Sequence, residues 1–401
     1  MFGQLSCLIL GGMNPLRTRQ QEIAVFGESG SGKTVLVSTF YGRAQEPQDD
    51  NLYWVVSDDT RRGNTLHQNY LGMRDSRQTP SATRFRPTSY SFSIRMRKEA
   101  DGRVARRRPF DALKLVWHDY PGEWFEFDPT GEEQQRRVDT FRRLLSSDVA
   151  GFLVDGQKLL DNVGEEERYL KKLFSNFRNG FLSLKDDILE DGRVLDDFPR
   201  IWILALSKAD LWPDLDVVDF RDLVVSKAGQ EVTELQEVLS GFVSAPEALS
   251  VGEDFLLLSS AEFTPERIDL SKNIGLDLML PFAAVLPFQR HLAWNRAALF
   301  PQQALEKALD SGVVDMAMLF ASFAPAVGPL RKIAGLRTVV GFFQRREALD
   351  GALGVAQERF REIGEQSRAK RDYLTAAIAG FLGDIERGEK DRVFFRSLRW
   401  R

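Results

Sequence analysis

A glycine-rich loop near the start of the chain carries the side chains best suited to chemistry. The apolar residues 22–26 run directly into Gly-Glu-Ser-Gly-Ser-Gly-Lys-Thr at residues 27–34, which has the pattern GxxxxGK[ST]. Glycines let the backbone adopt positive φ and turn its N–H groups toward a phosphate, and the next helix directs the positive end of its dipole there. We expect the Lys33 ammonium to reach the β- and γ-phosphates of a nucleotide and the Thr34 hydroxyl to bind Mg²⁺. The predicted phosphate-binding residues are Gly27, Ser29, Gly30, Ser31, Gly32, Lys33, Thr34 and Val35.

A carboxylate and a glycine follow a second apolar run. Residues 113–118 end at Asp-Tyr-Pro-Gly, residues 119–122, which is a DxxG pattern. At the tip of a strand, the Asp119 carboxylate would hold Mg²⁺ through water, and the Gly122 N–H would meet the γ-phosphate. Asp and Gly are also common in turns, so the pattern acquires its meaning from the preceding strand and the upstream loop.

Two more polar loops follow apolar runs and suit the recognition of a base. Residues 201–206 lead to Ser-Lys-Ala-Asp at 207–210, and residues 254–258 lead to Ser-Ser-Ala-Glu at 259–262. An Asp carboxylate accepts hydrogen bonds from N1–H and the 2-amino group of guanine. Adenine has no donor at either place, so Asp210 would select guanine. Lys208 would lay its alkyl stem across the base plane.

The apolar runs themselves predict the sheet that brings these loops together. Each run is short and is followed by a polar or glycine-containing loop and then a helical pattern, which is typical of buried parallel strands flanked by helices. The alternating residues 89–97 favour an edge strand antiparallel to 113–118. The predicted fold class is therefore α/β with a mixed, mostly parallel sheet. The expected strands are 22–26, 89–97, 113–118, 149–155, 201–206 and 254–258, and the expected helices are 133–147, 164–190, 217–241 and 271–296.

The α/β alternation stops near residue 297, and the pattern beyond it is all helical. Leu374, Ile378, Phe381, Leu382 and Ile385, for example, have the spacing of one helix face. We therefore predict an N-terminal extension over 1–20, an α/β domain with the phosphate loop over 21–297 and an all-α C-terminal domain over 298–401.

The four motifs, in this order and each at the end of a strand, resemble those of the Ras-like, TRAFAC-type P-loop GTPases over residues 21–296. The resemblance implies a GTPase that binds GTP or GDP with Mg²⁺ as a molecular switch. It places Lys208 and Asp210 at the base as an [NT]KxD motif, and backbone N–H groups of Ser260 and Ala261 at guanine O6. The string Asp-Tyr-Pro-Gly-Glu-Trp at 119–124 is similar to that of the YcjX-like bacterial P-loop proteins.

Three positions depart from the family pattern. Ser207 stands where Asn or Thr is usual, which removes an amide that ties the base loop to the phosphate loop, so we expect modest nucleotide affinity. Glu262 replaces the usual lysine of the last motif, in which backbone N–H groups make the main contact with guanine, so this change matters little. Glu123 stands where many relatives have a Gln that orients the attacking water, so either it takes part in a slow or differently organised hydrolysis or it is structural.

Other catalytic residues are expected between the first helix and residue 89. Thr88 directly precedes the strand 89–97, where relatives place a Thr that closes over Mg²⁺; Thr60, Thr79 and Thr83 are alternatives. Arg84 and Arg86 lie where an arginine could stabilise transition-state charge, although surface arginines are the alternative. The predicted catalytic residues are Lys33, Thr88, Arg86 and Glu123, and the predicted metal ligands are Thr34, Thr88 and Asp119.

Composition limits the remaining possibilities. The net charge of −4 gives no general attraction to nucleic acid or anionic lipid. One cysteine and three scattered histidines build neither a disulfide framework nor a zinc site, and the N-terminus lacks the pattern of a signal peptide, so we expect a cytoplasmic protein. The apolar window 313–328 contains Asp315 and is too short to cross a bilayer, which favours packed core over a membrane-inserting hairpin.

Three functions stay in competition at this stage. The first is a GTP switch read by the helical domain or by a protein partner. The second is a dynamin-like membrane-associated GTPase, and the third is an ATP-dependent P-loop enzyme. The basic residues 98–108 are either a solvated hairpin end or a patch for an acidic or nucleic-acid partner. The aromatic and basic tail 392–401 docks on a partner, on anionic lipid or on the chain's own core. The sequence does not determine the oligomeric state.

Overall fold

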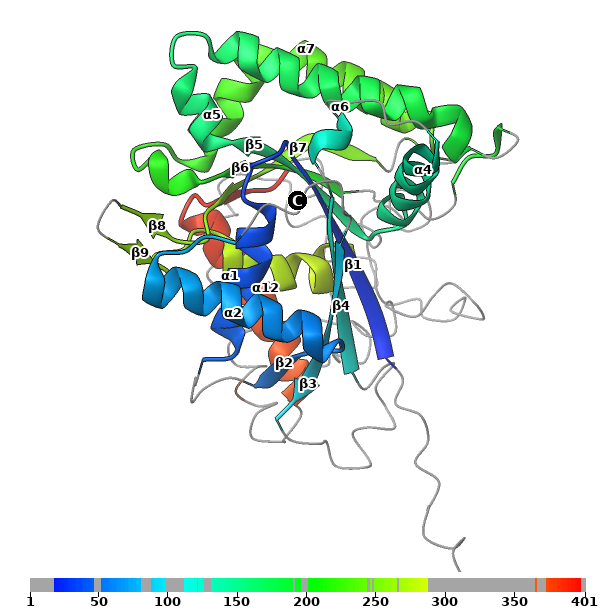
Figure 1. Cartoon of the computed structure of the whole chain (residues 1–401). Helices are drawn as coiled ribbons and strands as arrows, with labels where there is room; N and C mark the ends of the chain where they lie inside the picture. The colour runs from blue at the N-terminus through cyan, green and yellow to red at the C-terminus, as the bar shows by residue number, and fades with distance from the viewer. Residues whose placement is uncertain are drawn as a thin grey trace, which may run out of the picture.

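In the part of the chain that the structure describes, an eight-stranded sheet lies between two layers of helices (Figure 1). The computed structural model describes residues 18–46, 52–80, 88–97, 112–120, 122–125, 131–189, 192–195, 201–243, 246, 249–264, 267–287, 365 and 373–397. The strands of the sheet, in spatial order, are β10 (Phe394–Phe395), β7 (Ser250–Leu258), β6 (Ile201–Ser207), β5 (Val149–Asp155), β1 (Thr18–Phe26), β4 (Ala112–Asp119), β3 (Thr88–Met96) and β2 (Tyr53–Ser57).

The five central strands are parallel, so their C-terminal ends meet at one rim of the sheet. β1 pairs in parallel with β4 and β5, and β5, β6 and β7 continue in parallel. β3, β2 and β10 are antiparallel to their neighbours. The predicted α/β fold class, with a mixed and mostly parallel sheet, is confirmed.

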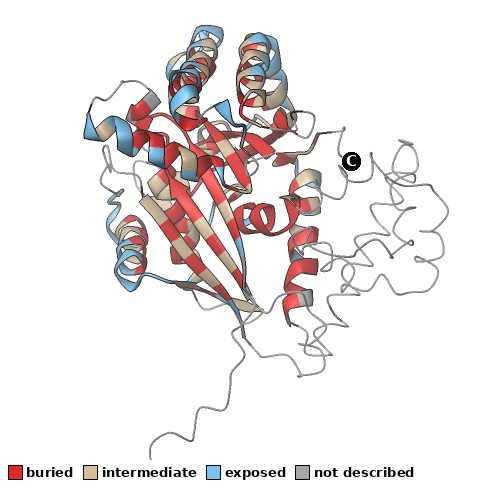
Figure 2. Cartoon of the chain, turned by 90° about the vertical axis from the view of Figure 1, so that its right-hand side faces the viewer, coloured by how far each residue is buried: buried red, intermediate tan, exposed pale blue. Residues whose placement is uncertain are grey.

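The sheet has a hydrophobic core on each face, because successive residues of a strand point to opposite sides. On β1, Ile23 and Val25 join one core, and Ala24 and Phe26 join the other. Figure 2 shows the buried strands and the exposed outer sides of the covering helices. The helices on the first face are α1 (Lys33–Ala44), α2 (Thr60–Ser76) and α12 (Tyr373–Lys390), and those on the second are α4 (Glu132–Leu145), α5 (Gly156–Asp161), α6 (Glu166–Ile188) and α7 (Val217–Ser240).

Short elements complete the loops at the rim. They are the 3₁₀ turns η1 (Gly122–Phe125), η3 (Ala209–Leu211) and η5 (Leu276–Leu278), and the hairpin of β8 (Glu262–Phe263) with β9 (Ile268–Asp269). The predicted helix 271–296 begins later than expected. Residues 270–275 make a turn and then a β-bridge between Ile274 and Ser259, η5 follows, and helix occupies 279–287 within the described residues.

The prediction of an edge strand at 89–97 is wrong, because β2 lies outside β3. The long connection after α1 contains this strand and α2, which the sequence pattern did not reveal. α2 packs on α1, and its Tyr70 and Met73 contact Ala261 and Leu270 near the base loop. The connection is therefore an ordered part of the sheet and its helical layer over the described residues 52–80.

The end of the chain also belongs to the sheet's own core. Residues 374–385 of α12 contribute Ile378, Phe381 and Ile385 to the core around α1, and β10 extends the sheet beside β7. Phe394 is buried and lies 4.6 Å from the ring of Phe282. The tail 392–397 thus docks on the chain itself. The remainder of the predicted helical domain, apart from residue 365, lies outside the described residues, including the apolar window 313–328.

Candidate functional site

The phosphate loop joins β1 to α1 at the rim of the sheet. Gly30 and Gly32 have φ of 83° and 89°, a left-handed conformation that side chains disfavour, which accounts for the glycines at these positions. The Lys33 ammonium lies inside the loop, donating to the carbonyl oxygens of Gly27 and Glu28 at 2.8 and 2.9 Å. Its burial requires such partners, because an unpaired buried ammonium is strongly unfavourable.

Hard oxygen ligands for a cation lie directly beside this loop. The Thr34 hydroxyl donates to the Asp119 carboxylate over 2.8 Å, and Thr88 is the cross-strand neighbour of Asp119 in the β3–β4 register. In the described part of the chain, no group of three or more His, Cys, Asp and Glu side chains forms a metal cluster. One hydroxyl and one carboxylate beside a phosphate loop fit Mg²⁺, which keeps several waters and takes phosphate oxygens as ligands.

The DxxG glycine packs against the backbone of the phosphate loop. A Cβ atom on Gly122 would lie 2.2 Å from the Ser29 nitrogen and 2.6 Å from the Gly27 oxygen, so this position admits only glycine without a shift. Tyr120 and Trp124, on either side of Gly122, are both 1% exposed and their rings lie 5.4 Å apart. Burial raises the pKa of Tyr120 well above its usual value. The two anchored rings fix the loop that places Gly122.

The base loop holds its carboxylate in a defined position. The Asp210 carboxylate accepts a hydrogen bond of 2.6 Å from the Ser259 hydroxyl and one of 3.2 Å from the Phe263 N–H. A carboxylate has about four acceptor positions, so this arrangement leaves acceptor capacity on both oxygens. Ser259, Ser260 and Ala261 are buried beneath the loop. The two base-reading loops predicted from the sequence therefore meet through Asp210 and Ser259.

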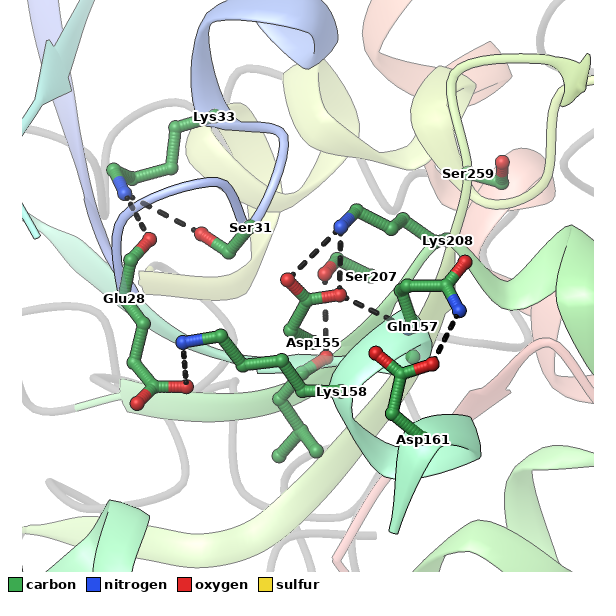
Figure 3. A network of polar contacts seen from close by, with 12 residues as sticks. Glu28, Ser31, Lys33, Asp155, Gln157, Lys158, Asp161, Ser207, Lys208 and Ser259 are labelled. Carbon is green, nitrogen blue, oxygen red and sulfur yellow. Dashed lines mark hydrogen bonds and ion pairs between the residues drawn. The ribbon is translucent and has the colours of Figure 1, made fainter. Parts of the chain in front are cut away.

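Lys208 takes a position that the sequence did not predict. Its backbone is left-handed, with φ of 54°, and its ammonium lies 2.8 Å from Oδ1 of Asp155 at the end of β5 (Figure 3). The Ser207 hydroxyl donates to the Val154 carbonyl oxygen over 3.2 Å, so it bonds to β5 rather than to the phosphate loop. Asp155 could have been found from sequence, because it ends an apolar run at the same rim as the four motifs.

The remaining predicted catalytic residues are only partly described. Thr88 begins β3 beside Asp119, whereas Thr60 begins α2. Glu123 lies in η1, but its side chain is outside the described part, and so are Arg84, Arg86 and Thr83. The structure thus brings the phosphate loop, Asp119, Thr88 and Gly122 together on one side of the rim, and Lys208, Asp210, Ser260 and Ala261 on the other.

The glycine-rich loop between β1 and α1, at the rim of a mostly parallel sheet, is the arrangement of a P-loop fold. No protein-family model and no curated protein matches the sequence. The chain is similar to a solved signal recognition particle receptor SRb-GTP/SRX complex from Chaetomium thermophilum, with a TM-score of 0.31 and 16% identity over 61% of this chain and 91% of that chain. A putative nucleolar GTP-binding protein 1 from Plasmodium falciparum gives a TM-score of 0.29 and 11% identity over 78% of this chain and 98% of that one.

A third similar structure is an oligomerised bacterial dynamin pair, with a TM-score of 0.25 and 12% identity over 93% of this chain and 69% of that chain. All three TM-scores are low, so the geometry of the site, rather than these likenesses, supports the function proposed below. The narrower similarity to YcjX-like proteins stays a prediction. Among the described residues, none of the helices combines the length and the apolar character needed to span a bilayer.

Proposed function

We propose that this protein binds guanine nucleotide with Mg²⁺ and hydrolyses GTP to GDP as a molecular switch. The observation that carries the proposal is the base loop, in which Ser259 and the Phe263 N–H orient the Asp210 carboxylate while leaving it acceptor positions. Guanine offers two donors, N1–H and the 2-amino group, to one carboxylate, and adenine cannot. The phosphate loop and the Thr34–Asp119 pair lie at the same rim.

Within this proposal each side chain has a separate task. The loop amides and Lys33 hold the β- and γ-phosphates, and Thr34 binds Mg²⁺ while Asp119 holds it through water. Thr88 and the Gly122 N–H respond to the γ-phosphate, since both adjoin Asp119 or the phosphate loop. Glu123 and Arg86 are candidates for promoting hydrolysis. The C-terminal residues 298–401, for which the sequence predicts a helical domain, or a protein partner in the cytoplasm would read the GTP-bound state.

Nucleotide selectivity tests this function directly. Calorimetric titration in magnesium buffer should give measurable affinity for GDP and GTP and none for ATP. Asp210→Asn should lose guanine preference and gain xanthine nucleotide, because an amide donates to the xanthine 2-oxygen where the carboxylate accepted from the amino group. Equal binding of ATP and GTP by the wild-type protein would overturn the proposal.

The catalytic assignments need a second measurement. Single-turnover GTP hydrolysis should fall in Glu123→Ala or Arg86→Ala if the corresponding side chain acts on the γ-phosphate, while GTP affinity stays within about twofold. The dynamin-like alternative rests on residues 313–345, outside the described part. Vesicle co-sedimentation that disappears on deletion of that segment would favour it.

A further inference from the structure

The proposed nucleotide site has two halves, the phosphate loop and the base loop, whose relative position must be fixed. The position of Ser207, where the resembled family has an amide that ties the two loops together, does not supply this tie here. Ser207 has one hydroxyl proton, which it donates to Val154 on β5. A nucleotide binds the phosphate loop and the base loop at once, so the affinity depends on how well their separation is fixed before binding.

On the phosphate side, the link begins at Glu28, whose side chain points away from the loop into the protein (Figure 3). Glu28 is 6% exposed, and its Oε2 lies 3.1 Å from the Lys158 ammonium of α5. The same oxygen accepts a hydrogen bond from the Tyr169 hydroxyl over 3.3 Å. A buried carboxylate with these partners fixes the second residue of the phosphate loop to α5 and α6.

On the base side, the link ends at the ion pair of Asp155 with Lys208. Asp155 is 2% exposed; its two oxygens lie 2.8 and 2.9 Å from the Lys208 ammonium, and Oδ1 also accepts from the Gln157 N–H. The base loop also approaches the start of α5 closely, since a Cβ on Gly156 would lie 2.5 Å from the Ser207 carbonyl oxygen. The stem of Lys208 is thereby held in one orientation.

Tyr169 joins the two sides. Its hydroxyl accepts a hydrogen bond from the Asp155 N–H over 3.1 Å and donates one to Glu28. Burial, followed by the nearby charge of Glu28, raises the pKa of Tyr169, so the hydroxyl keeps the proton that it donates. The tyrosine is 7% exposed and its ring belongs to the core on the α6 face, which holds the hydroxyl in place.

We propose that Tyr169 is a positioning residue that couples the phosphate loop to the base loop through Glu28 on one side and Asp155 with Lys208 on the other. The proposal rests on the proposed function and deepens it, because it assigns the coupling of phosphate and base recognition to a residue outside the four motifs. The coupling takes the place of the amide that Ser207 lacks.

Tyr169→Phe tests the coupling, because it removes only the bridging hydroxyl. Calorimetry should show the Kd for GDP rising about fivefold, since one buried hydrogen bond is worth roughly that factor. The Kd for inorganic pyrophosphate, which occupies the phosphate loop alone, should change less than twofold. Tyr53→Phe is the control: Tyr53 lies on the edge strand β2 opposite Met96, at the end of β3 far from Thr88, so both Kd values should be unchanged.

The outcomes separate the two proposals. A wild-type protein without affinity for GDP would end the proposed function. If the wild-type protein binds GDP, and Tyr169→Phe binds GDP and pyrophosphate with the same Kd values as the wild type, only the coupling is refuted. This holds even if the melting temperature of Tyr169→Phe falls. An equal loss for both ligands would also overturn it. If Tyr169→Phe does not fold, Asp155→Asn should give the same selective loss for GDP, and unchanged GDP affinity in that variant would refute the coupling.

Discussion

The contact of Gly122 with the phosphate loop makes Gly122→Ala the most informative substitution. The added methyl group would lie 2.2 Å from the Ser29 nitrogen and 2.3 Å from the Glu28 carbonyl carbon, whereas ordinary van der Waals contact begins at 3.4 Å. These neighbours are backbone atoms that cannot rotate away, and Tyr120 and Trp124 hold the other side. A displacement of about 1 Å is therefore required, and overpacking of this kind costs about 1–3 kcal/mol.

Two assays measure this effect. Urea unfolding without nucleotide should show a loss of about 1–3 kcal/mol in the free energy of unfolding. If the γ-phosphate meets the Gly122 N–H as proposed, GTP affinity should fall further than GDP affinity, because GDP lacks that group. Gly229→Ala serves as the control: it directly follows the break in α7 at Ala228, and its nearest new contact is 4.0 Å away, so we expect a free energy of unfolding close to that of the wild type.

Wild-type stability together with wild-type binding of GTP and GDP in Gly122→Ala would contradict the contact. Such a result would mean that Gly122 does not touch the phosphate loop in solution. Loss of stability with an unchanged ratio of the two affinities would keep the contact and remove its role at the γ-phosphate.

Three other substitutions probe separate parts of the molecule. Thr34→Ala should reduce the ratio of GTP affinity with Mg²⁺ to that without Mg²⁺ by at least about tenfold. Thr34→Ser retains the hydroxyl and should keep the wild-type ratio; titrations with and without EDTA measure both. Burial raises the pKa of Glu386 to about 7, with a smaller contribution from Glu389 and against the opposing charge of Arg396. The folded state therefore favours neutral Glu386, and stability is lost as pH rises from about 4.3 through 7. Glu386→Gln should therefore be more stable than wild type at pH 8 by on the order of 1 kcal/mol and nearly equal at pH 5, measured by urea unfolding; a constant difference would contradict this. Phe394→Ala should lose about 3–5 kcal/mol in a single unfolding transition, since Phe394 is 1% exposed; a separate transition for the chain's end would argue that it folds independently.

The loops of the site could be predicted because their signals are contiguous. The residues around Lys33 combine an apolar strand, a glycine-rich turn and a helix start in one stretch, and Asp119 and Asp210 each follow such a strand directly. β2 was missed although its residues Tyr-Trp-Val-Val-Ser favour a strand, and its edge position depends on pairing with β3, which no local pattern specifies. α2 was missed because its sequence is mostly polar and contains two glycines. The side chains of Glu123 and Arg86 lie outside the described residues, so their roles stay predictions.

By itself, the sequence determined the fold class, the order along the chain of the loops that follow the strands, and the chemistry that each loop offers. These properties follow from local hydrophobicity and residue type. Only the tertiary structure decided which distant side chains meet. The four residues of the proposed coupling lie far apart in the sequence: Glu28 follows β1, Asp155 ends β5, Lys208 follows β6 and Tyr169 lies on α6. Nothing in their own sequence neighbourhoods marks them as partners. The same holds for the chain's end, because the amphipathic face of α12 required burial but did not specify which surface would cover it.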